Sequence, residues 1–128
     1  LFSEIKSASL LAKAVSRDAA SLDAHAALRM ATINGAKALA WDNEIGSLEL
    51  GKQADIIAVK IDSISQQPLY NPASQLVYTN SGSQVSHSWV AGKMLLENRK
   101  LCTINERSLI QTTEQWRKKI HPDHEHFD

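Results

Sequence analysis

The sequence IGSLELGKQADIIAV, residues 45–59, decides how this chain folds. Turn signals at Gly46-Ser47 and Gly51-Lys52 enclose an alternation of apolar and polar residues. Residues 56–59 then form a short apolar run, rich in β-branched side chains, that predicts a strand buried on both faces. Both glycines are expected to adopt positive φ or to permit a close approach of the backbone. Asp55 is expected to fix the start of the strand by accepting hydrogen bonds from backbone amides rather than to take part in catalysis.

The residues before this stretch show the three- and four-residue apolar spacing of helices. A first helix is predicted over residues 2–15. Its apolar stripe comprises Ile5, Ala8, Leu11 or Ala12, and Val15. A second helix should run to about residue 31, with Ser21 as N-cap and Asp23 near its positive end. A short third helix should follow through Leu39, beginning at Thr32 or Asn34. A lone His25 in the second helix is interpreted as a packed or solvent-tipped side chain rather than a ligand.

The residues after the central strand predict a loop, a helical turn and a β-hairpin. Residues 62–72 have loop composition, and Pro72 is suited to the first turn of a short helix over residues 72–78. Residues 85–90 and 94–97 are expected to pair around a turn at residues 91–93. His87 shares one face of this hairpin with Trp89 and is interpreted as a sheet-surface residue rather than a ligand.

A last helix is predicted after residue 104. Thr103 and Glu106 have the spacing of a capping box. One face of the helix carries Leu109, Thr113, Trp116 and Ile120. The basic residues 117–119 suit its negative C-terminal end. Cys102, which precedes the helix, is interpreted as a small buried hydrophobe rather than a reactive thiol.

Composition narrows the possible functions. The 128 residues include 43% hydrophobic and 22% charged side chains, with a formal net charge of zero. This balance gives no basic excess for nucleic acid and no acidic solvating tail. No apolar run reaches the roughly 18 residues of a membrane span, and no signal peptide pattern opens the chain. A single cysteine permits no internal disulfide, which favours a cytoplasmic location.

The tail HPDHEHFD, residues 121–128, gathers three of the five histidines together with three carboxylates. Such groups could bind zinc or nickel. The tail's H-x-H sequence, His124-Glu125-His126, follows Pro122 and Asp123 at a chain end, however, where nothing fixes the imidazole rings or excludes water. Adventitious binding or none is therefore expected.

Two motifs give the chain a family resemblance. The pattern IGSLE-x-GK-x-ADIIAV at residues 45–59 resembles the C-terminal signature of metal-dependent amidohydrolases. The segment ALRMATINGAKAL, residues 27–39, is similar to the helix that precedes this signature in the same superfamily. The branch it most resembles contains the methylthioadenosine/S-adenosylhomocysteine deaminases and the chlorotriazine hydrolases. Members usually have glycine as a left-handed C-cap where this chain has Ala40, and Trp41 is expected to cover that helix end as a hydrophobic plug.

The resemblance implies a (β/α)₈ barrel that holds a divalent metal, zinc or iron. Its ligands would be an H-x-H motif on the first strand, histidines on the fifth and sixth, and an aspartate on the eighth. None of these ligands can be placed in this sequence, which corresponds to a minor part of a typical member. We therefore assign no catalytic, cofactor-binding or metal-binding residue to the chain, and expect no cofactor in it.

The predicted fold class is an α+β fragment in three parts. Residues 1–41 would be terminal barrel helices, residues 42–104 part of a composite small β-sandwich, and residues 105–128 a C-terminal helix and tail. The predicted function is the C-terminal part of a metal-dependent aminohydrolase, inactive alone. It would act by hydrolytic deamination or dechlorination of an adenosine-type or triazine heterocycle. The alternative is a stand-alone α+β interaction module without catalysis.

The expected partners are the rest of the protein's own barrel and β domain, and a homo-oligomer is also expected. This expectation follows from apolar helix and strand surfaces that an isolated chain would leave open. Neither nucleic acid nor a membrane is an expected partner.

Overall fold

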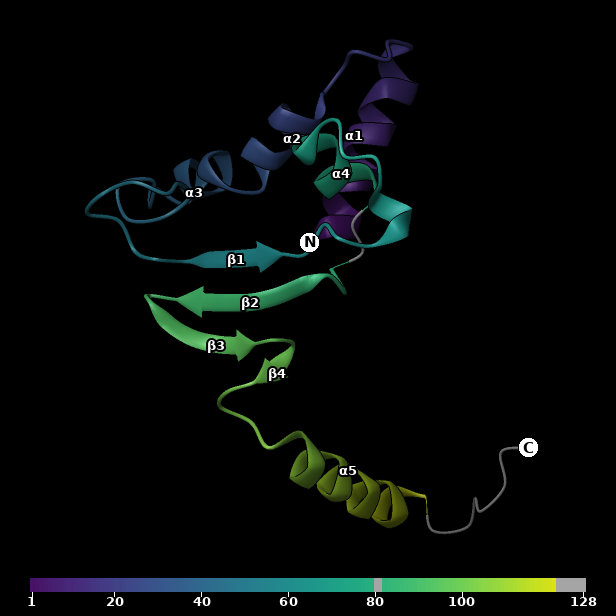
Figure 1. The fold of residues 1–128 in the computed structure, drawn as a ribbon, viewed down its shortest axis with the longest axis vertical. Coiled ribbons are helices and arrows are strands. Elements are labelled where there is room, and N and C mark those ends of the chain that lie inside the picture. The colour runs from purple at the N-terminus through teal and green to yellow at the C-terminus, as the bar shows by residue number, and fades with distance from the viewer. Residues whose placement is uncertain (80–81, 122–128) are drawn as a thin grey trace.

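The structure, a computed structural model, describes residues 1–79 and 82–121. Figure 1 shows helices gathered on the β1 side of an antiparallel sheet and a last helix on the β4 side. The elements in order are α1 (Phe2–Ser16), α2 (Ala24–Met30), α3 (Ile33–Ala38), β1 (Ile56–Val59), a 3-10 turn (Ile64–Gln66), α4 (Pro72–Tyr78), β2 (Val85–Val90), β3 (Lys93–Glu97), β4 (Lys100–Leu101) and α5 (Glu106–Ile120). The predicted α+β class is confirmed.

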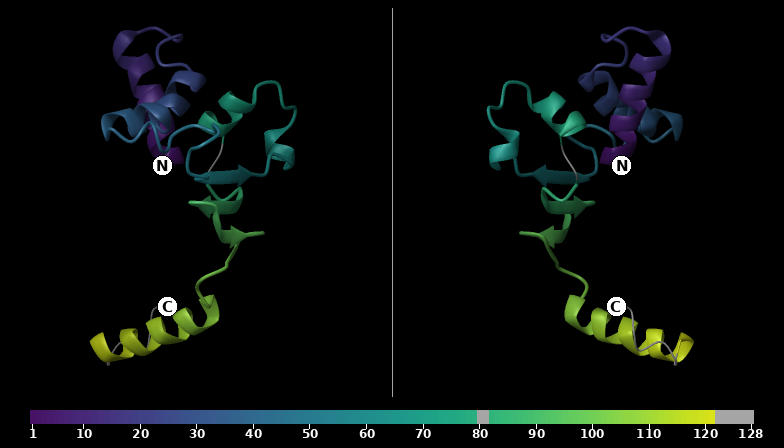
Figure 2. Two further views of the ribbon diagram at one scale, coloured as in Figure 1. Left: turned by 90° about the vertical axis from the view of Figure 1, so that its left-hand side faces the viewer. Right: turned by 90° about the vertical axis from the view of Figure 1, so that its right-hand side faces the viewer.

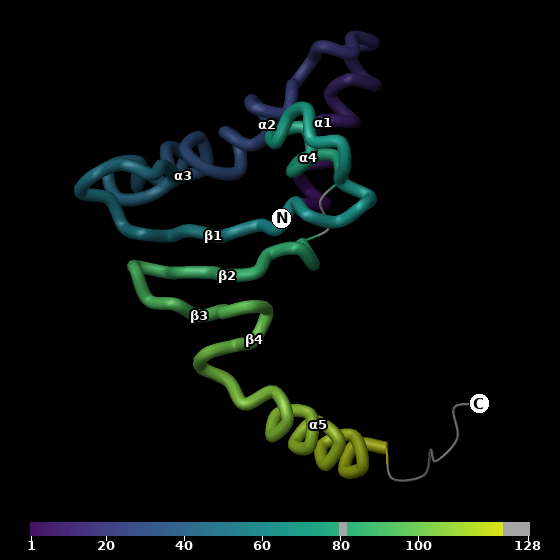
Figure 3. Tube along the Cα trace, in the orientation of Figure 1, coloured from purple at the N-terminus to yellow at the C-terminus, as the bar shows by residue number. Residues whose placement is uncertain are grey.

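Helices α1, α2 and α4 share a small apolar core. Its buried members are Ile5, Ala24, Ala27, Ala73 and Val77. All five side chains are small or β-branched, so the three helices can approach closely. Figure 3 shows that α4 returns to α1 and α2 although the chain passes through β1 between them. Of the two alternatives predicted for the α1 stripe, Ala12 is half-buried and Leu11 is exposed. Val15 is exposed, contrary to prediction.

The caps of α2 and α3 correct two details of the sequence prediction. Asp23, not Ser21, is the N-cap of α2, because its side chain accepts from the Ala26 amide at 2.8 Å. Thr32 holds the N-cap position of α3, but its hydroxyl donates to the Leu28 carbonyl instead of capping. Ser21 is excluded as N-cap because α2 begins three residues further along the chain.

Helix α3 ends in a left-handed cap without glycine. Ala40 has φ 56°, and its amide donates to the Lys37 carbonyl while the Trp41 amide donates to the Ala36 carbonyl at 2.9 Å. This pair of bonds is a Schellman motif, which satisfies the last helical carbonyls. The prediction that Trp41 covers the helix end as a hydrophobic plug is wrong, since the Trp41 side chain is 57% exposed. The residue closes the helix through its backbone amide.

The segment between α3 and β1 folds back on the helix through Gly46. This glycine has φ 91°, and a Cβ on it would lie 2.7 Å from the Ala36 Cβ. Gly51 also has positive φ, at 89°, but a Cβ there would meet nothing within 4 Å. Both predictions of positive φ are confirmed, and only Gly46 also provides a close approach. Asp55 acts as predicted, since its carboxylate accepts from the Ala91 amide at 2.7 Å.

The sheet has four antiparallel strands in the order β1-β2-β3-β4. The hairpin prediction is confirmed: Ala91 and Gly92 both have positive φ, as a tight two-residue turn requires. A similar turn at Asn98 and Arg99 leads to β4, which the sequence analysis missed. Strand β1 lies at the sheet edge, and Ile57 is 50% exposed. The prediction that this strand is buried on both faces is therefore wrong for the chain as described.

The C-terminal region differs from prediction at its start. Asn105 caps α5 by accepting from the Ser108 amide at 3.1 Å, so the capping box assigned to Thr103 and Glu106 is wrong. Asparagine lies directly before the first helical residue, where its short side chain reaches the exposed amides. Cys102 is exposed, which contradicts its assignment as a buried hydrophobe. Figure 2 shows α5 set apart from the other helices in both views.

Candidate functional site

The histidines do not converge in the part of the chain that the structure describes. His25 is exposed on α2, in agreement with the second of its two predicted environments, a packed or a solvent-tipped side chain. His87 stacks on Trp89, with ring centroids 5.6 Å apart and planes within 9°, which confirms their predicted common face. His121 follows α5 as its C-cap. The remaining histidines belong to residues 122–128 and lie outside the described residues.

Metal binding needs several side chains aimed at one point. Within residues 1–79 and 82–121, no group of three or more histidine, cysteine, aspartate or glutamate side chains could hold a metal ion. The ligand set that the family resemblance implies for zinc or iron is not formed by these residues. No step of a metal-dependent reaction can therefore be assigned to them.

A hollow of about 440 Å³ lies between α3 and the segment that follows it. It is lined mostly by small and aliphatic side chains; its polar lining side chains are Thr32, Ser47 and Asp55. Asp55 is already engaged with the Ala91 amide, and the Thr32 hydroxyl donates to the Leu28 carbonyl. The Ser47 hydroxyl accepts from Lys52 Nζ at 2.6 Å. The rest of this lining is apolar and suits packing.

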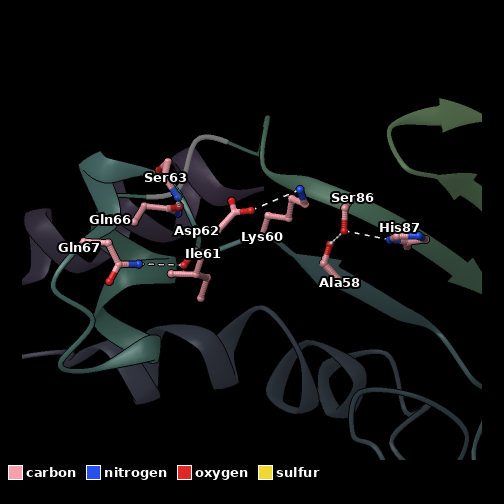
Figure 4. Close-up of polar contacts among 9 residues, drawn as sticks. All are labelled: Ala58, Lys60, Ile61, Asp62, Ser63, Gln66, Gln67, Ser86 and His87. Atoms are coloured by element: carbon pink, nitrogen blue, oxygen red, sulfur yellow. Dashed lines mark hydrogen bonds and ion pairs between the residues drawn. The ribbon is translucent and has the colours of Figure 1, made fainter.

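Figure 4 shows a polar contact that joins β1 to β2 and others within the loop that follows β1. The buried Ser86 hydroxyl donates to the Ala58 carbonyl at 3.2 Å and lies 2.9 Å from His87 Nδ1. A serine beside a histidine can indicate a nucleophile and its base. Here the hydroxyl bonds across the strand pair, and no carboxylate among residues 1–79 and 82–121 bonds to the ring, so the contact has a structural role.

The loop after β1 is also held by polar side chains (Figure 4). Lys60 and Asp62 form an exposed ion pair of 3.3 Å. Gln66 is buried, and its side-chain oxygen Oε1 accepts a hydrogen bond from the Ser63 hydroxyl at 2.8 Å. The side-chain amide of Gln75, on α4, donates to the Gln66 backbone carbonyl at 2.9 Å. These bonds fix the path of the chain from β1 back to the helical cluster.

One buried polar junction lies inside the helical cluster, and the sequence analysis missed it. Ser9 is fully buried; its hydroxyl donates to the Leu22 carbonyl at 2.7 Å and lies 2.8 Å from the Tyr78 hydroxyl. Ser9 follows Ile5 by four residues, so helical spacing places it on the buried face of α1. That spacing was the signal available in the sequence: it places Ser9 on the buried face, and a buried hydroxyl requires a hydrogen-bond partner.

Apolar side chains remain exposed on several elements. The cross-strand register places Ile57, Ser88, Leu96 and Leu101 in one row across the sheet. Ile57 and Leu101, at the ends of this row, are exposed. Leu10, Leu11 and Val15 are exposed on α1. Exposed apolar side chains that gather on one face of a protein can mark contacts with other protein surfaces.

Comparison with known proteins identifies the class. The model of the Amidohydrolase family matches residues 1–95. The chain therefore belongs to the Amidohydrolase family.

Relatives within this family narrow the comparison. A 5-methylthioadenosine/S-adenosylhomocysteine deaminase of Teredinibacter turnerae is 48% identical over 94% of this chain and 27% of its own length. The corresponding deaminase of Saccharophagus degradans is 43% identical over the same shares. The chain thus spans about a quarter of the length of these curated relatives.

Two solved structures resemble the fold described above. An adenosine deaminase from Xanthomonas campestris with bound zinc is 44% identical, with a TM-score of 0.86 over 94% of this chain and 28% of that chain. An atrazine chlorohydrolase from Arthrobacter aurescens, complexed with zinc, is 26% identical, with a TM-score of 0.79 over 90% of this chain and 26% of that chain. The predicted relation to deaminases and triazine hydrolases is confirmed.

In the part of the chain that the structure describes, no helix is both long enough and apolar enough to cross a membrane.

Proposed function

We propose that this chain is the C-terminal part of a metal-dependent aminohydrolase that deaminates an adenosine-type thioether. The observation that carries this proposal is the similarity to a methylthioadenosine/S-adenosylhomocysteine deaminase over nearly the whole chain. Dechlorination of a triazine heterocycle is the related reaction supported by the likeness to the atrazine chlorohydrolase. The closer sequence relation to the deaminases favours deamination.

The proposed role of the chain is structural support of an active site formed elsewhere. Helices α1–α3 would rest on the barrel, and β1–β4 would complete a small β domain together with other strands of the same protein. The exposed Ile57 and Leu101 support this role, because both would be buried by a second apolar layer. The edge position of β1 supports it too, since an unpaired edge can accept another strand.

The metal of the proposed enzyme would be zinc or iron, and zinc is present in the similar solved structures. When bound, such an ion lowers the pKa of a water molecule and so supplies a nucleophile. The described residues offer no ligand group for it, so the ligands would come from other residues of the protein. The same proposal includes a cytoplasmic location, in accord with a single cysteine.

A complementation assay tests the proposal. The 128-residue chain and a truncated Teredinibacter turnerae deaminase, lacking its matching 120 residues, would be expressed separately and together with zinc. We expect methylthioadenosine deamination only from the mixture. Turnover by the 128-residue chain alone would contradict the assignment of catalysis to other residues. An inactive mixture in which the two pieces bind one another would contradict the proposed enzyme identity.

A further inference from the structure

Helix α5 carries an apolar stripe that the described residues leave uncovered. The stripe consists of Leu109, Thr113, Trp116 and Ile120, whose successive spacings of four, three and four residues place them on one face. Its three apolar members are 52%, 57% and 68% exposed in sequence order, and no residue of α5 is buried. An amphipathic helix normally gains most of its stability by packing such a face on another surface. The stripe therefore indicates a surface outside the described residues.

The relatives of this chain share α5. The match to the Teredinibacter turnerae deaminase runs over 120 of the 128 residues and so includes part of the helix. The superposition on the Xanthomonas campestris deaminase covers 94% of this chain and therefore also extends into α5. The matched part is 27% of the first protein and 28% of the second. In both relatives, α5 thus belongs to a polypeptide with a much larger body of other residues.

The direction of α5 indicates which side of the sheet such a body would occupy. In both views of Figure 2, α5 and helices α1–α3 project to the same side of the strands. Helices α1–α3 lie beyond β1 and α5 lies beyond β4, so the chain has the outline of a bracket with the sheet as its back. Because α1–α3 are proposed to rest on the barrel of the same protein, other residues of that protein would lie on the side to which α5 projects.

The small size of the stripe favours a surface of the same polypeptide over a separate protein. Four side chains bury much less than the about 1,200–2,000 Å² of a stable interface between separate proteins. Covalent continuity lowers this requirement, because a surface on the same chain is present at an effective concentration on the order of 1 mM. A contact of this size is therefore sufficient within one polypeptide and insufficient for a stable dimer.

We propose that the stripe of α5 packs on the rest of the same polypeptide, so that this chain holds the rest of its own protein from two sides, through α1–α3 and through α5. The inference rests on the proposed function, in which these residues are part of a larger hydrolase. Trp116 is the main contact, because its aromatic side chain has the largest apolar area of the four. Lys119 Nζ lies 4.9 Å from the centroid of this ring and covers one of its faces, which leaves the other face for packing.

Photo-cross-linking tests the inference in a whole protein. A chimera would carry this chain in place of the matching 120 residues of the Teredinibacter turnerae deaminase. The photoreactive residue p-benzoylphenylalanine would replace either Trp116, on the stripe, or Gln111, on the far side of α5. After irradiation of dilute protein, proteolysis and mass spectrometry identify the linked peptides. We expect several-fold more linking from position 116 than from position 111, within one polypeptide and to peptides outside the 128 residues.

Three results would overturn the inference. Linking from position 116 mainly in a covalent dimer would assign the stripe to a second copy. Linking mainly to the 128 residues themselves would mean that α5 folds back on its own chain. Equal yields from the two positions, or none from position 116, would show that the stripe is not a docking surface. Methylthioadenosine turnover by the unlabelled chimera tests the proposed function separately, because the pattern of links does not depend on activity.

Thermal unfolding of the chimera gives a second measurement that needs no photoreactive residue. Trp116→Asp should lower the Tm by several degrees at every protein concentration, because the contact lies within one polypeptide. Gln111→Asp is the matched control and should change the Tm little. A loss of Tm that shrinks on dilution would indicate a contact between copies. Equal Tm values for the two variants and the parent chimera would contradict the docking of α5.

Discussion

The helical cluster of this chain buries its own apolar side chains, whereas the sheet leaves part of its apolar side chains exposed. The α1–α2–α4 cluster encloses its own core around Val77, and a buried serine inside it has both of its hydrogen-bond partners. The sheet leaves Ile57 and Leu101 exposed at the ends of one row. The first region should be stable without help. For the second region we propose that another surface covers these side chains.

The largest expected effect of a substitution is at the centre of the closed region. Val77→Asp would place an unpaired charge at a side chain with no exposure and should lower the free energy of unfolding by at least about 3 kcal/mol. Val15→Asp is the matched control, because Val15 is exposed on α1 and the change should cost within about 0.5 kcal/mol. Urea unfolding followed by circular dichroism measures both. Similar losses at the two positions would show that the cluster has no closed core.

Substitutions at two glycines separate the cost of a close Cβ contact from the cost of an unfavourable φ. Gly46→Ala should cost about 2–4 kcal/mol, because the new Cβ meets Ala36 and the φ of 91° is unfavourable for alanine. Gly51→Ala has nearly the same φ but open space around it, so about 1–2 kcal/mol is expected. Thermal unfolding of both variants gives the difference. Equal losses would mean that the segment does not pack on α3 as described.

The buried hydroxyl pair gives a smaller effect. Tyr78→Phe removes one partner of Ser9 but leaves the bond from Ser9 to the Leu22 carbonyl. The free energy of unfolding should fall by about 0.5–1.5 kcal/mol. Tyr70→Phe, at an exposed tyrosine, is the control and should leave stability unchanged. If both variants unfold like the parent chain, the contact between α1 and α4 is not maintained in solution.

The smallest effect is expected on the open face of the sheet. Ile57→Asp should change the stability of the 128-residue chain by within about 1 kcal/mol, because half of this side chain is already in water. The same change should prevent association with the truncated deaminase of the complementation assay, where the face would be buried. Binding measured by titration calorimetry distinguishes the two effects. Undiminished binding would place the contact on a different surface.

Local patterns in the sequence predicted the elements well and their surroundings poorly. The glycine positions, the Ala91-Gly92 hairpin and the helix starting at Pro72 depend on neighbouring residues, and all were confirmed. The burial of Ile57 and Cys102 depends on what covers them, and both predictions were wrong for this chain. An apolar run indicates that a surface will be buried, but it does not say which part of a protein buries it.

For the candidate site, too, local motifs gave correct predictions, whereas contacts between distant residues were missed. Family motifs indicated a metal-dependent hydrolase, and comparison confirmed the family, because long motifs keep their order along the chain. The junction of Ser9, Leu22 and Tyr78 was missed because its members come from distant parts of the sequence. Only the helical spacing from Ile5 to Ser9 offered a signal. The partner of that buried hydroxyl could not be predicted from local pattern.

Amide hydrogen exchange tests the central claim most directly, namely that the sheet of this chain is completed by other residues of a larger hydrolase. Exchange would be measured for the 128-residue chain alone and after addition of the truncated deaminase. The account predicts that α1, α2 and α4 are protected in both samples, whereas β1 gains strong protection only in the mixture. Full protection of β1 in the chain alone, unchanged by the second polypeptide, would contradict it.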